Sequence, residues 1–299
     1  MSKQRLYIEE YVTLTNGYKL WTKRSENGSV PVLLIHGGPG GSSSMLQPIE
    51  EKLQDLGYQT IVYNQLGSIH SDNPDEPGLW TIEDFTSHLE QVCDALGLTK
   101  FYIFGYSWGV VLALEYVLRH PKRLYGLILS NFTASAESFE KHMQILRPKL
   151  SIDSRRTLDQ LEKINDFTNP AWVKIITEEF MPKHFCILKP MPAAFDEFMK
   201  ELNWKICHHF FGKNDFVVKG AAKGWNRWAD LPNINVPTLV LSGASDQCSP
   251  ADAKRMGSLM PKGSAHIIPR SSHVPFYENP TDYFEALNQF LKSTKQLED

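Results

Sequence analysis

A series of short, continuously apolar runs constrains the fold of this chain more than any other feature. The runs are VPVLLIHG, QTIVYN, FYIFG, LYGLILS, VPTLVLSG and SAHIIP. Runs of this kind are typical of strands buried on both faces of a parallel sheet. Helical patterns separate most of them, and this alternation predicts an α/β fold with a mostly parallel central sheet flanked by helices.

Local patterns place some of the elements around that sheet. Residues 81–97 carry apolar side chains at spacings of three and four, with Thr81 suited to cap the start of a helix. Residues 280–292 repeat this spacing and predict the last helix. Near the start of the chain, Asn16-Gly17 separates two strand-like runs and predicts a hairpin turn.

The pattern changes between residues 133 and 230. Buried-strand runs vanish there, and helical segments rich in Phe, Trp, Met and charge follow one another, broken by prolines. This predicts a helical cap, residues 133–230, inserted into a core made of residues 1–132 and 231–299. A chain of 299 residues is long enough for a core with such an insertion.

The charge balance excludes several classes of partner. The chain has 31 basic and 34 acidic residues and a formal net charge of -3, which favours neither nucleic acid nor anionic lipid. No stretch approaches the roughly 18 apolar residues of a membrane helix, and the first residues lack the apolar centre of a secretory signal. We therefore expect a cytoplasmic protein, a monomer or small homo-oligomer, with no nucleic-acid or membrane partner.

The cysteines and histidines do not form a metal or disulfide pattern. The four cysteines are far apart and show no CxxC pairing, which predicts free thiols: Cys93, Cys186, Cys207 and Cys248. His208 and His209 are adjacent, so their side chains point in different directions, and no HExxH accompanies them. We predict no metal site and no cofactor.

A GxSxG motif occupies residues 105–109, between the FYIFG run and a helix that begins near Trp108. The strand must turn sharply into the helix to lift the Ser107 hydroxyl above the sheet, and small residues two before and two after the serine relieve the crowding. The position at a strand-to-helix junction favours a nucleophile over an ordinary serine in a Gly-rich turn. We predict that Ser107 is a nucleophile.

A serine hydroxyl is a weak nucleophile near neutral pH and needs a histidine base oriented by a carboxylate. Asp246 follows the VPTLVLSG run, and His273 lies in a Ser-Ser loop before the last helix. Their order after Ser107 is the one expected for this type of strand-turn-helix nucleophile. Rival candidates for the acid and the base remain: Asp252, Asp230 and His70.

The segment HGGPG at residues 36–40 follows the first buried run. It lacks the GxxxxGK[ST] pattern of a phosphate loop, and it matches a glycine loop that donates a backbone N–H toward an acyl oxygen. Negative charge developing on that oxygen would be met by the N–H groups of Gly38 and Trp108. A plain Gly-Pro turn would not predict a GxSxG later in the same chain.

Taken together, these motifs resemble those of the proline iminopeptidases, a branch of the α/β-hydrolases. The shared segments lie in the family's order and include HGGPGG (36–41), YNQLGSIHSD (63–72), GYSWG (105–109) and FGKNDFVVKGAAKGWNRWADL (211–231). The resemblance implies an α/β-hydrolase fold with a helical cap over the site. It also implies an aminopeptidase that removes an N-terminal residue, preferentially proline, from short peptides.

The resemblance also implies where the substrate's ammonium would bind. The family uses two glutamates, and by motif match they fall at Asp215 and Gln247. Exchanging a glutamate for Gln247 removes one full negative charge from that pair, and Asp215 is one methylene shorter. Other positions also depart from the family pattern: Asn64, Tyr106, Val110 and Asn226.

These departures keep other functions open. An amide, ester or lactone hydrolase that needs no free amine would use the same reactive residues, and Gln247 favours it. Solvated surface roles for Asp215 and Gln247 remain alternatives to substrate binding. A binding protein that has lost turnover is a third hypothesis, although every reactive residue is present. The leading hypothesis is a serine peptidase acting on N-terminal proline or a small apolar residue of short peptides.

Overall fold

The computed structural model describes residues 5–297 and contains one eight-stranded sheet, in the order β1-β2-β4-β3-β5-β6-β7-β8. β1 and β2 pair antiparallel, as do β2 and β4, and all other neighbours are parallel. The predicted α/β fold and the hairpin at Asn16-Gly17 are therefore confirmed, as are five of the six predicted buried strands; the SAHIIP run forms β8 at the edge of the sheet, where most of its residues keep solvent access. The strands are Tyr7–Thr13, Lys19–Ser25, Pro31–Ile35, Gln59–Tyr63, Phe101–Tyr106, Leu124–Ser130, Thr238–Gly243 and Gly263–Ile268, from β1 to β8.

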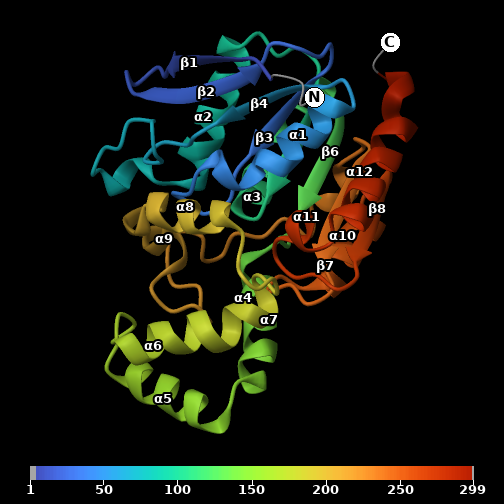
Figure 1. The fold of residues 1–299 in the computed structure, drawn as a ribbon. Helices are drawn as coiled ribbons and strands as arrows, with labels where there is room; N and C mark the ends of the chain where they lie inside the picture. Colours follow the sequence, from blue (N-terminus) through green and yellow to red (C-terminus); the bar gives the residue numbers. More distant parts are fainter. Residues whose placement is uncertain (1–4, 298–299) are drawn as a thin grey trace.

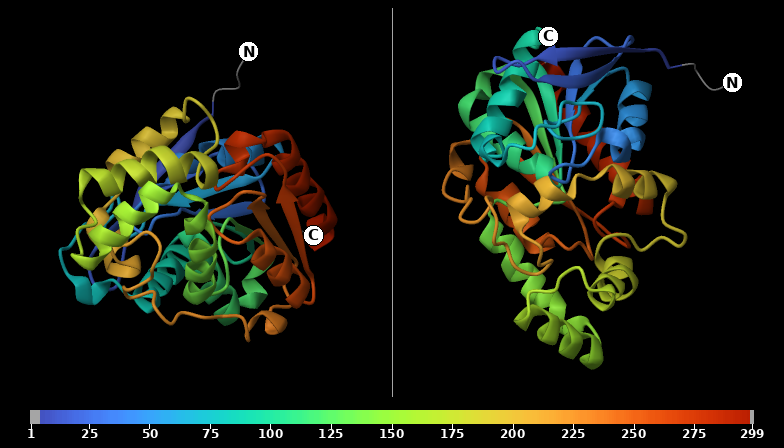
Figure 2. Two further views of the ribbon diagram at one scale, coloured as in Figure 1. Left: turned by 90° about the horizontal axis from the view of Figure 1, so that it is seen from below. Right: turned by 90° about the vertical axis from the view of Figure 1, so that its left-hand side faces the viewer.

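Helices cover both faces of the sheet (Figures 1 and 2). One apolar core packs α2 (Ile82–Ala95), α3 (Trp108–Arg119) and α10 (Pro250–Leu259) against one face. A second core packs α1 (Gln47–Asp55), α11 (Pro275–Glu278) and α12 (Pro280–Thr294) against the other. The Thr81 hydroxyl accepts the N–H of Asp84, so the predicted cap of α2 is present. No helix within residues 5–297 has the length and apolarity needed to cross a membrane.

A helical segment separates β6 from β7 and lies at the carboxyl ends of the parallel strands, with α5 and α6 farthest from the sheet (Figure 1). It has its own apolar core, in which Trp172, Phe180 and Phe216 are buried. The segment falls inside the range predicted from the change of sequence pattern. Its helices are α4 (Ala136–Leu146), α5 (Ile152–Lys163), α6 (Pro170–Ile175), α7 (Met181–His184), α8 (Ala193–Glu201) and α9 (Trp204–Phe211).

Glycines in the core loops allow α8 and α9 to lie close to the sheet. A Cβ on Gly40 would lie 2.7 Å from the carbonyl oxygen of Asn203. A Cβ on Gly41 would overlap the Phe198 ring, and one on Gly67 would overlap Ile206. These glycines therefore serve the approach of the helical segment, since any side chain there would push it away.

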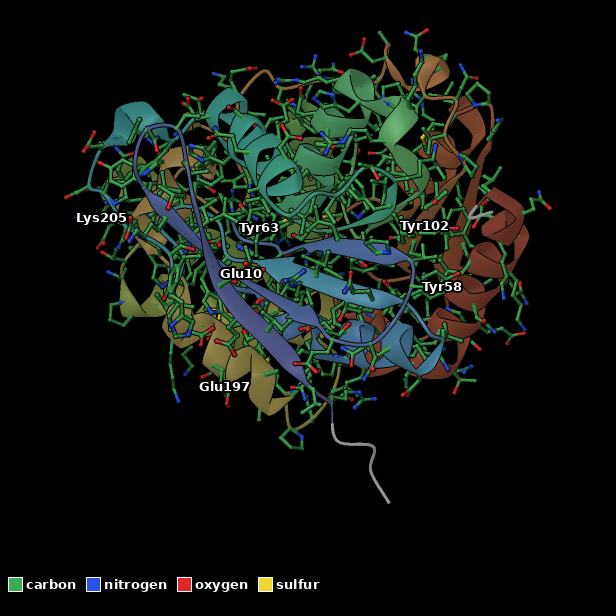
Figure 3. The ribbon with its side chains drawn as sticks, turned by 90° about the horizontal axis from the view of Figure 1, so that it is seen from above. Glu10, Tyr58, Tyr63, Tyr102, Glu197 and Lys205 are labelled. Atoms are coloured by element: carbon green, nitrogen blue, oxygen red, sulfur yellow. The ribbon has the colours of Figure 1, made fainter. Side chains whose placement is uncertain are left out.

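Hydrogen bonds also hold the helical segment close to these core loops. The N–H of Asn203 donates to the Gly40 carbonyl over 2.8 Å, and its side-chain amide donates to the Gly67 carbonyl over 2.9 Å. At the periphery, Lys205 of α9, labelled in Figure 3, lies at the edge of the molecule. It forms an ion pair of 2.8 Å with Asp75. That ion pair is exposed and contributes little free energy, so the buried contacts carry the docking.

The two chain segments that connect the helices to the core are joined to each other. Ser135 and Asn226 form an isolated antiparallel bridge. Next to it, the buried carboxylate of Glu115 on α3 accepts the indole N–H of Trp225 over 2.7 Å and two guanidinium N–H groups of Arg227 over 2.7 and 2.9 Å. A buried carboxylate with this many donors is strongly positioned, so the root of the helical segment is fixed to α3.

Candidate active site

Ser107 occupies the sharp turn between β5 and α3, with φ 51° and ψ -121°. A Cβ on Gly105 would lie 2.6 Å from the carbonyl oxygen of Gly109, and a Cβ on Gly109 would overlap the carbonyl of Ile35. The motif glycines are thus required by the crowding that the sharp turn creates. The N–H of Ser107 donates to the Ser130 carbonyl over 2.8 Å, which holds the turn against β6.

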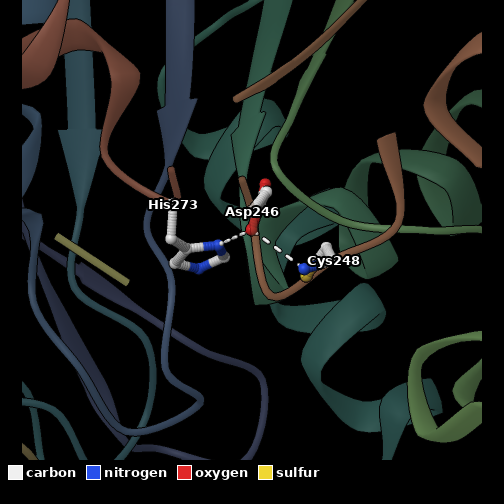
Figure 4. Close-up of side chains that lie close together, drawn as sticks. All are labelled: Asp246, Cys248 and His273. Atoms are coloured by element: carbon white, nitrogen blue, oxygen red, sulfur yellow. Dashed lines mark hydrogen bonds and ion pairs between the residues drawn. The ribbon is translucent and has the colours of Figure 1, made fainter. Parts of the chain in front are cut away.

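The structure brings Ser107, His273 and Asp246 into one hydrogen-bonded chain. His273 Nδ1 lies 2.8 Å from Asp246 Oδ1, and His273 Nε2 lies 3.1 Å from Ser107 Oγ. Because a carboxylate only accepts, Nδ1 carries the proton and Nε2 is free to accept the serine hydroxyl. Figure 4 shows the carboxylate of Asp246 facing the imidazole from the loop after β7. This is the geometry of a nucleophile with a positioned base.

Further donors saturate the carboxylate of Asp246. The backbone N–H of Cys248 donates to Oδ1 over 2.9 Å, and the side-chain amide of Asn131 donates to Oδ2 over 2.6 Å. The Ser242 hydroxyl also reaches Oδ2 at 3.4 Å. Asn131 follows β6 directly and has a left-handed backbone, φ 62°. No sequence motif pointed to Asn131, since a lone asparagine after a strand is an ordinary turn residue.

Asp246, Cys248 and His273 also form a group whose possible ligand atoms lie within 4.8 Å of one another. The carboxylate oxygens are already occupied by hydrogen-bond donors. Burial, and then the nearby charge of Asp246, raises the pKa of the Cys248 thiol well above its ordinary value, so the thiol stays protonated. A metal binds the thiolate and free lone pairs, so this group fits hydrogen bonding to His273 rather than metal ligation.

The glycine loop after β3 lies directly against the nucleophile. A Cβ on Gly37 would lie 3.1 Å from the Ser107 Cβ, and Gly38 has φ 124°, a conformation that requires glycine. Trp108 is the first residue of α3, so its N–H has no acceptor inside the helix. Among residues 5–297, neither this N–H nor the N–H of Gly38 donates a hydrogen bond to a backbone carbonyl. Both remain available to an oxygen bound beside Ser107.

Gln65 connects the glycine loop, through His36, to the side chain of Trp108. Its backbone N–H donates to His36 Nε2 over 3.1 Å, and its side-chain amide donates to the His36 carbonyl over 3.1 Å. Its side-chain oxygen accepts the indole N–H of Trp108 over 2.9 Å. Burial lowers the pKa of His36 to about 4, so the ring stays neutral and can accept from Gln65 at neutral pH. One buried amide thus ties the glycine loop to the start of α3.

Two histidines from the helical segment hold the loop that carries Asp246. His142 Nε2 lies 3.2 Å from the carbonyl oxygen of Asp246, and His184 Nδ1 lies 3.0 Å from that of Ser245. The N–H of Gln247 donates to the His184 carbonyl over 2.9 Å. Burial lowers the pKa of both histidines, so each is a neutral N–H donor at neutral pH. Sequence reasoning missed both residues.

Asp215 lies in the loop after α9 and accepts the indole N–H of Trp172 at Oδ2 over 2.7 Å. Its side chain keeps access to solvent, yet burial by the surrounding protein raises its pKa. Protein atoms therefore surround the Asp215 carboxylate closely enough to raise its pKa, while solvent still reaches the side chain. Cys207 on α9 is close enough for the charge of Asp215 to contribute, after burial, to a pKa of about 12 for its thiol.

A row of packed rings leads from Asp215 to the loop of Gln247. Phe216, the next residue after Asp215, packs edge-to-face on Phe180 with ring centroids 5.4 Å apart. Phe180 packs on the His184 ring at 5.2 Å, and the His184 carbonyl accepts the Gln247 N–H. The two residues that the motif match assigned to ammonium binding are therefore connected through α7, and Gln247 adjoins Asp246.

The rival candidates lie elsewhere. Asp252 is in the first turn of α10 and accepts the Thr133 hydroxyl over 3.1 Å. Asp230 pairs with Arg227 at 3.5 Å, at the root of the helical segment. His70 is exposed and packs against the Trp21 ring. Within the described residues, Ser107 and His273 form their side-chain hydrogen bonds with each other and with Asp246 instead.

Comparison with known proteins places this geometry in a family. The model of the α/β-hydrolase fold family matches residues 30–280. A proline iminopeptidase of Flavobacterium johnsoniae is 31% identical over 278 residues, which cover 92% of this chain and 94% of that protein. This chain belongs to the proline iminopeptidase family of α/β-hydrolases.

Solved structures agree with that assignment. The crystal structure of proline iminopeptidase from Mycobacterium smegmatis has a TM-score of 0.89 and 26% identity, and covers 98% of this chain and 100% of its own. The crystal structure of VinJ has a TM-score of 0.90 and 29% identity, and covers 96% of this chain and 99% of its own. The family fold therefore extends over nearly the whole chain, including the helical segment.

The departures from the family pattern have structural reasons. The Tyr106 hydroxyl donates to the His273 carbonyl over 3.1 Å, and its ring packs on the His273 ring at 5.5 Å. The Phe185 ring also packs on the His273 ring, with centroids 5.1 Å apart. The Asn64 amide accepts the Ser43 N–H and donates to the Ile69 carbonyl. Tyr106 therefore tightens the packing around the base, and Asn64 joins the two loops beside it.

Proposed function

We propose that this member of the family is a serine aminopeptidase that releases an N-terminal proline or small apolar residue from short peptides through an acyl-enzyme. The observation that carries the proposal is the hydrogen-bonded chain Ser107–His273–Asp246 beside the N–H groups of Gly38 and Trp108. The names of the similar proteins support the choice of substrate.

In the first half of the reaction, Ser107 Oγ attacks the carbonyl carbon of the scissile amide while His273 Nε2 takes the hydroxyl proton. Asp246 keeps the proton on Nδ1 and stabilises the imidazolium that forms. The N–H groups of Gly38 and Trp108 donate to the developing oxyanion, and losing one such donor would cost on the order of 10²-fold in rate. His273 then gives its proton to the leaving amine.

In the second half, water replaces the leaving amine and His273 takes one of its protons. The hydroxide equivalent attacks the acyl carbon, and the same N–H groups receive the second oxyanion. Collapse of this intermediate breaks the bond to Ser107 Oγ, which recovers its proton from His273. The free amino acid leaves, and no cofactor takes part in any of these steps.

The amino end of the substrate binds under the helical segment in this proposal. Residues 133–230 act as a cap over a core of residues 1–132 and 231–299, of which residues 1–4 and 298–299 lie outside the described part. The carboxylate of Asp215 pairs with the substrate's ammonium, and the neutral side chain of Gln247 accepts a hydrogen bond from it. Trp172 and the enclosed position of Asp215 support this assignment.

A substrate panel tests the proposal. A prolyl-arylamide, its N-acylated counterpart and a simple aryl ester would be compared by kcat/KM. An enzyme that requires the ammonium cleaves the first and ignores the second. Replacement of Ser107 by Ala should abolish turnover and labelling by a fluorophosphonate, with Ser258→Ala, at an exposed serine of α10, as the control.

A second candidate function rests on Gln247. An amide, ester or lactone hydrolase without need for a free amine would be favoured because this side chain adds no negative charge beside Asp246. Comparable rates on the free and N-acylated arylamides would decide for it. If Ser107 resists the fluorophosphonate while small ligands still bind, the chain is a binding protein and both hydrolase proposals fail.

A further inference from the structure

We propose that Trp172 is a positioning residue for the substrate's amino group: its indole N–H fixes one oxygen of Asp215 and leaves the other oxygen to the amine. This inference rests on the proposed function, because it concerns the same binding site. Trp172 belongs to α6, in the part of the helical segment that lies farthest from the sheet (Figure 1). No sequence motif pointed to a role for this residue.

The Trp172 ring cannot turn away from Asp215. It is buried, with 2% of its surface accessible, and the Phe167 ring packs edge-to-face on it with centroids 5.1 Å apart. Phe216, the neighbour of Asp215, packs on it at 6.3 Å. The hydrogen bond from Nε1 to Oδ2 is 2.7 Å long, which is typical of a charge-assisted bond.

The loop that carries Asp215 is fixed on both sides as well. On the amino side, the Asn214 side chain donates to Glu162 over 2.8 Å. On the carboxyl side, the Phe216 carbonyl accepts the Gln144 amide over 2.9 Å, and the Val218 N–H donates to Glu140 over 2.9 Å. With its backbone and one oxygen held, the carboxylate presents its second oxygen in a single direction.

The electrostatics of the position match a substrate cation. Within residues 5–297 no lysine, arginine or histidine forms an ion pair with Asp215. Burial raises the pKa of Asp215, and the hydrogen bonds from the Trp172 indole and from the backbone N–H of Asp215 itself lower it again. The Cys207 thiol is near enough to feel the charge of this carboxylate, but burial raises the thiol's pKa to about 12 and keeps it neutral. A carboxylate that solvent still reaches and that has no protein cation is free to pair with the cation of a ligand.

Asp215 is the only one of the two family positions that keeps a charge, because Gln247 is neutral. Recognition of the ammonium therefore depends on Asp215 being ionised and correctly turned. Removing the indole N–H would raise the pKa of Asp215 further and free the carboxylate to rotate. Both effects weaken binding of a charged amine and leave the reaction at Ser107 unaltered.

The test compares three variants with the wild type. Trp172→Phe removes the N–H and keeps a buried ring. Asp215→Asn removes the charge itself. Trp225→Phe is the matched control, since its indole N–H also donates to a buried carboxylate, Glu115, at the root of the helical segment. KM and kcat would be measured from pH 5 to 9 on a prolyl-arylamide and on an aryl ester that has no amine.

For Trp172→Phe we expect KM for the prolyl-arylamide to rise about ten-fold with kcat nearly unchanged, as for loss of a hydrogen bond to a charged group. We also expect the acid limb of kcat/KM to move to higher pH, because Asp215 would ionise later. The ester should be unaffected. Trp225→Phe should keep the wild-type KM and acid limb.

Other results would overturn the inference. If Asp215→Asn raises KM but Trp172→Phe changes neither KM nor the acid limb, Trp172 only packs and the proposed function stands. If Asp215→Asn has no effect either, the ammonium site of the proposed function is wrong.

A second variant separates the N–H from packing. Trp172→His places a ring N–H where Nε1 lies in tryptophan but removes the benzene half of the indole. At pH 8 we expect its KM to stay near that of the wild type, and a KM as high as that of Asp215→Asn would refute the role of the N–H. This variant decides the question if Trp172→Phe does not fold.

Discussion

Asp246 shows how one side chain depends on neighbours that no motif names. Its Oδ2 accepts the Asn131 amide over 2.6 Å, at a position of the chain where the left-handed backbone suits asparagine. Asn131 also donates to the Ser272 carbonyl over 3.3 Å, so the same amide touches the loop of His273. Asn131 therefore holds Asp246 and the loop of His273 in fixed positions relative to each other.

Replacing Asn131 by Asp should disturb this arrangement in a specific way. Two carboxyl groups in hydrogen-bond contact cannot both ionise, so the pKa of the pair should rise. We expect the acid limb of kcat/KM to move to higher pH by one unit or more, with activity recovered in part at alkaline pH. An unchanged pH profile would mean that Asn131 does not position Asp246.

The Asp215 carboxyl group that we propose as the ammonium site should lower the stability of the folded protein at neutral and alkaline pH. Burial raises its folded-state pKa above the unfolded value. Its contribution to stability is therefore present below the unfolded pKa and is lost as pH rises through the folded pKa. We expect Asp215→Asn to have a larger free energy of unfolding than the wild type at pH 8 and a similar one at pH 4, measured by urea denaturation. A constant difference between the two pH values would contradict this.

The sequence predicted the residues whose chemistry requires a fixed local pattern. Ser107 needs small neighbours in a sharp turn, and Asp246 and His273 follow strand ends, so their places could be predicted from the chain. Asn131, Trp172 and His184 could not be predicted, because each acts through a contact between segments far apart in the sequence. Nothing in their own neighbourhoods distinguishes them from turn, core or surface residues.

At the scale of elements, the core strands were predictable because burial on both faces produces continuous apolar runs. The boundaries of the helices between β6 and β7 were not, since several are short and their apolar residues pack in a separate small core. The structure also gives the last two glycines of the HGGPGG segment a role that differs from the one predicted for the segment. Gly40 and Gly41 make room for the helical segment rather than for a substrate.

The contact between that loop and α8 can be tested directly. Gly41→Ala would place a Cβ against the Phe198 ring and 2.7 Å from the Gly37 carbonyl oxygen, so we expect a loss of about 1–3 kcal/mol of unfolding free energy. Gly78→Ala is the control, since a Cβ there meets nothing within 4 Å. Equal thermal stability of the two variants would show that α8 moves away at no cost.

At the scale of the whole molecule, buried histidines govern the response to acid. Burial lowers the pKa of His36 to about 4, and it also lowers that of His88, His142 and His184. Such groups contribute stability above their unfolded pKa, and this is lost as pH falls through the folded pKa. Buried carboxyl groups whose pKa is raised act in the opposite direction, as at Glu50 and Asp252.

His36 should make the largest single contribution to the loss of unfolding free energy as the pH falls. Its pKa falls from 6.5 to about 4, so its share of the unfolding free energy, about 3 kcal/mol, should disappear between about pH 6.5 and pH 4. Denaturant unfolding of the wild type and of His36→Asn, whose amide does not titrate, would measure this. The variant should lose less stability over this pH range, and parallel losses in both proteins would rule out His36 as the cause.

The backbone around the end of α7 receives one hydrogen bond from each of two reactive loops. The His184 carbonyl accepts the N–H of Gln247, and the Phe185 carbonyl accepts the N–H of His273 over 3.1 Å. A shift of this short helix would therefore displace the carboxylate and the imidazole at the same moment.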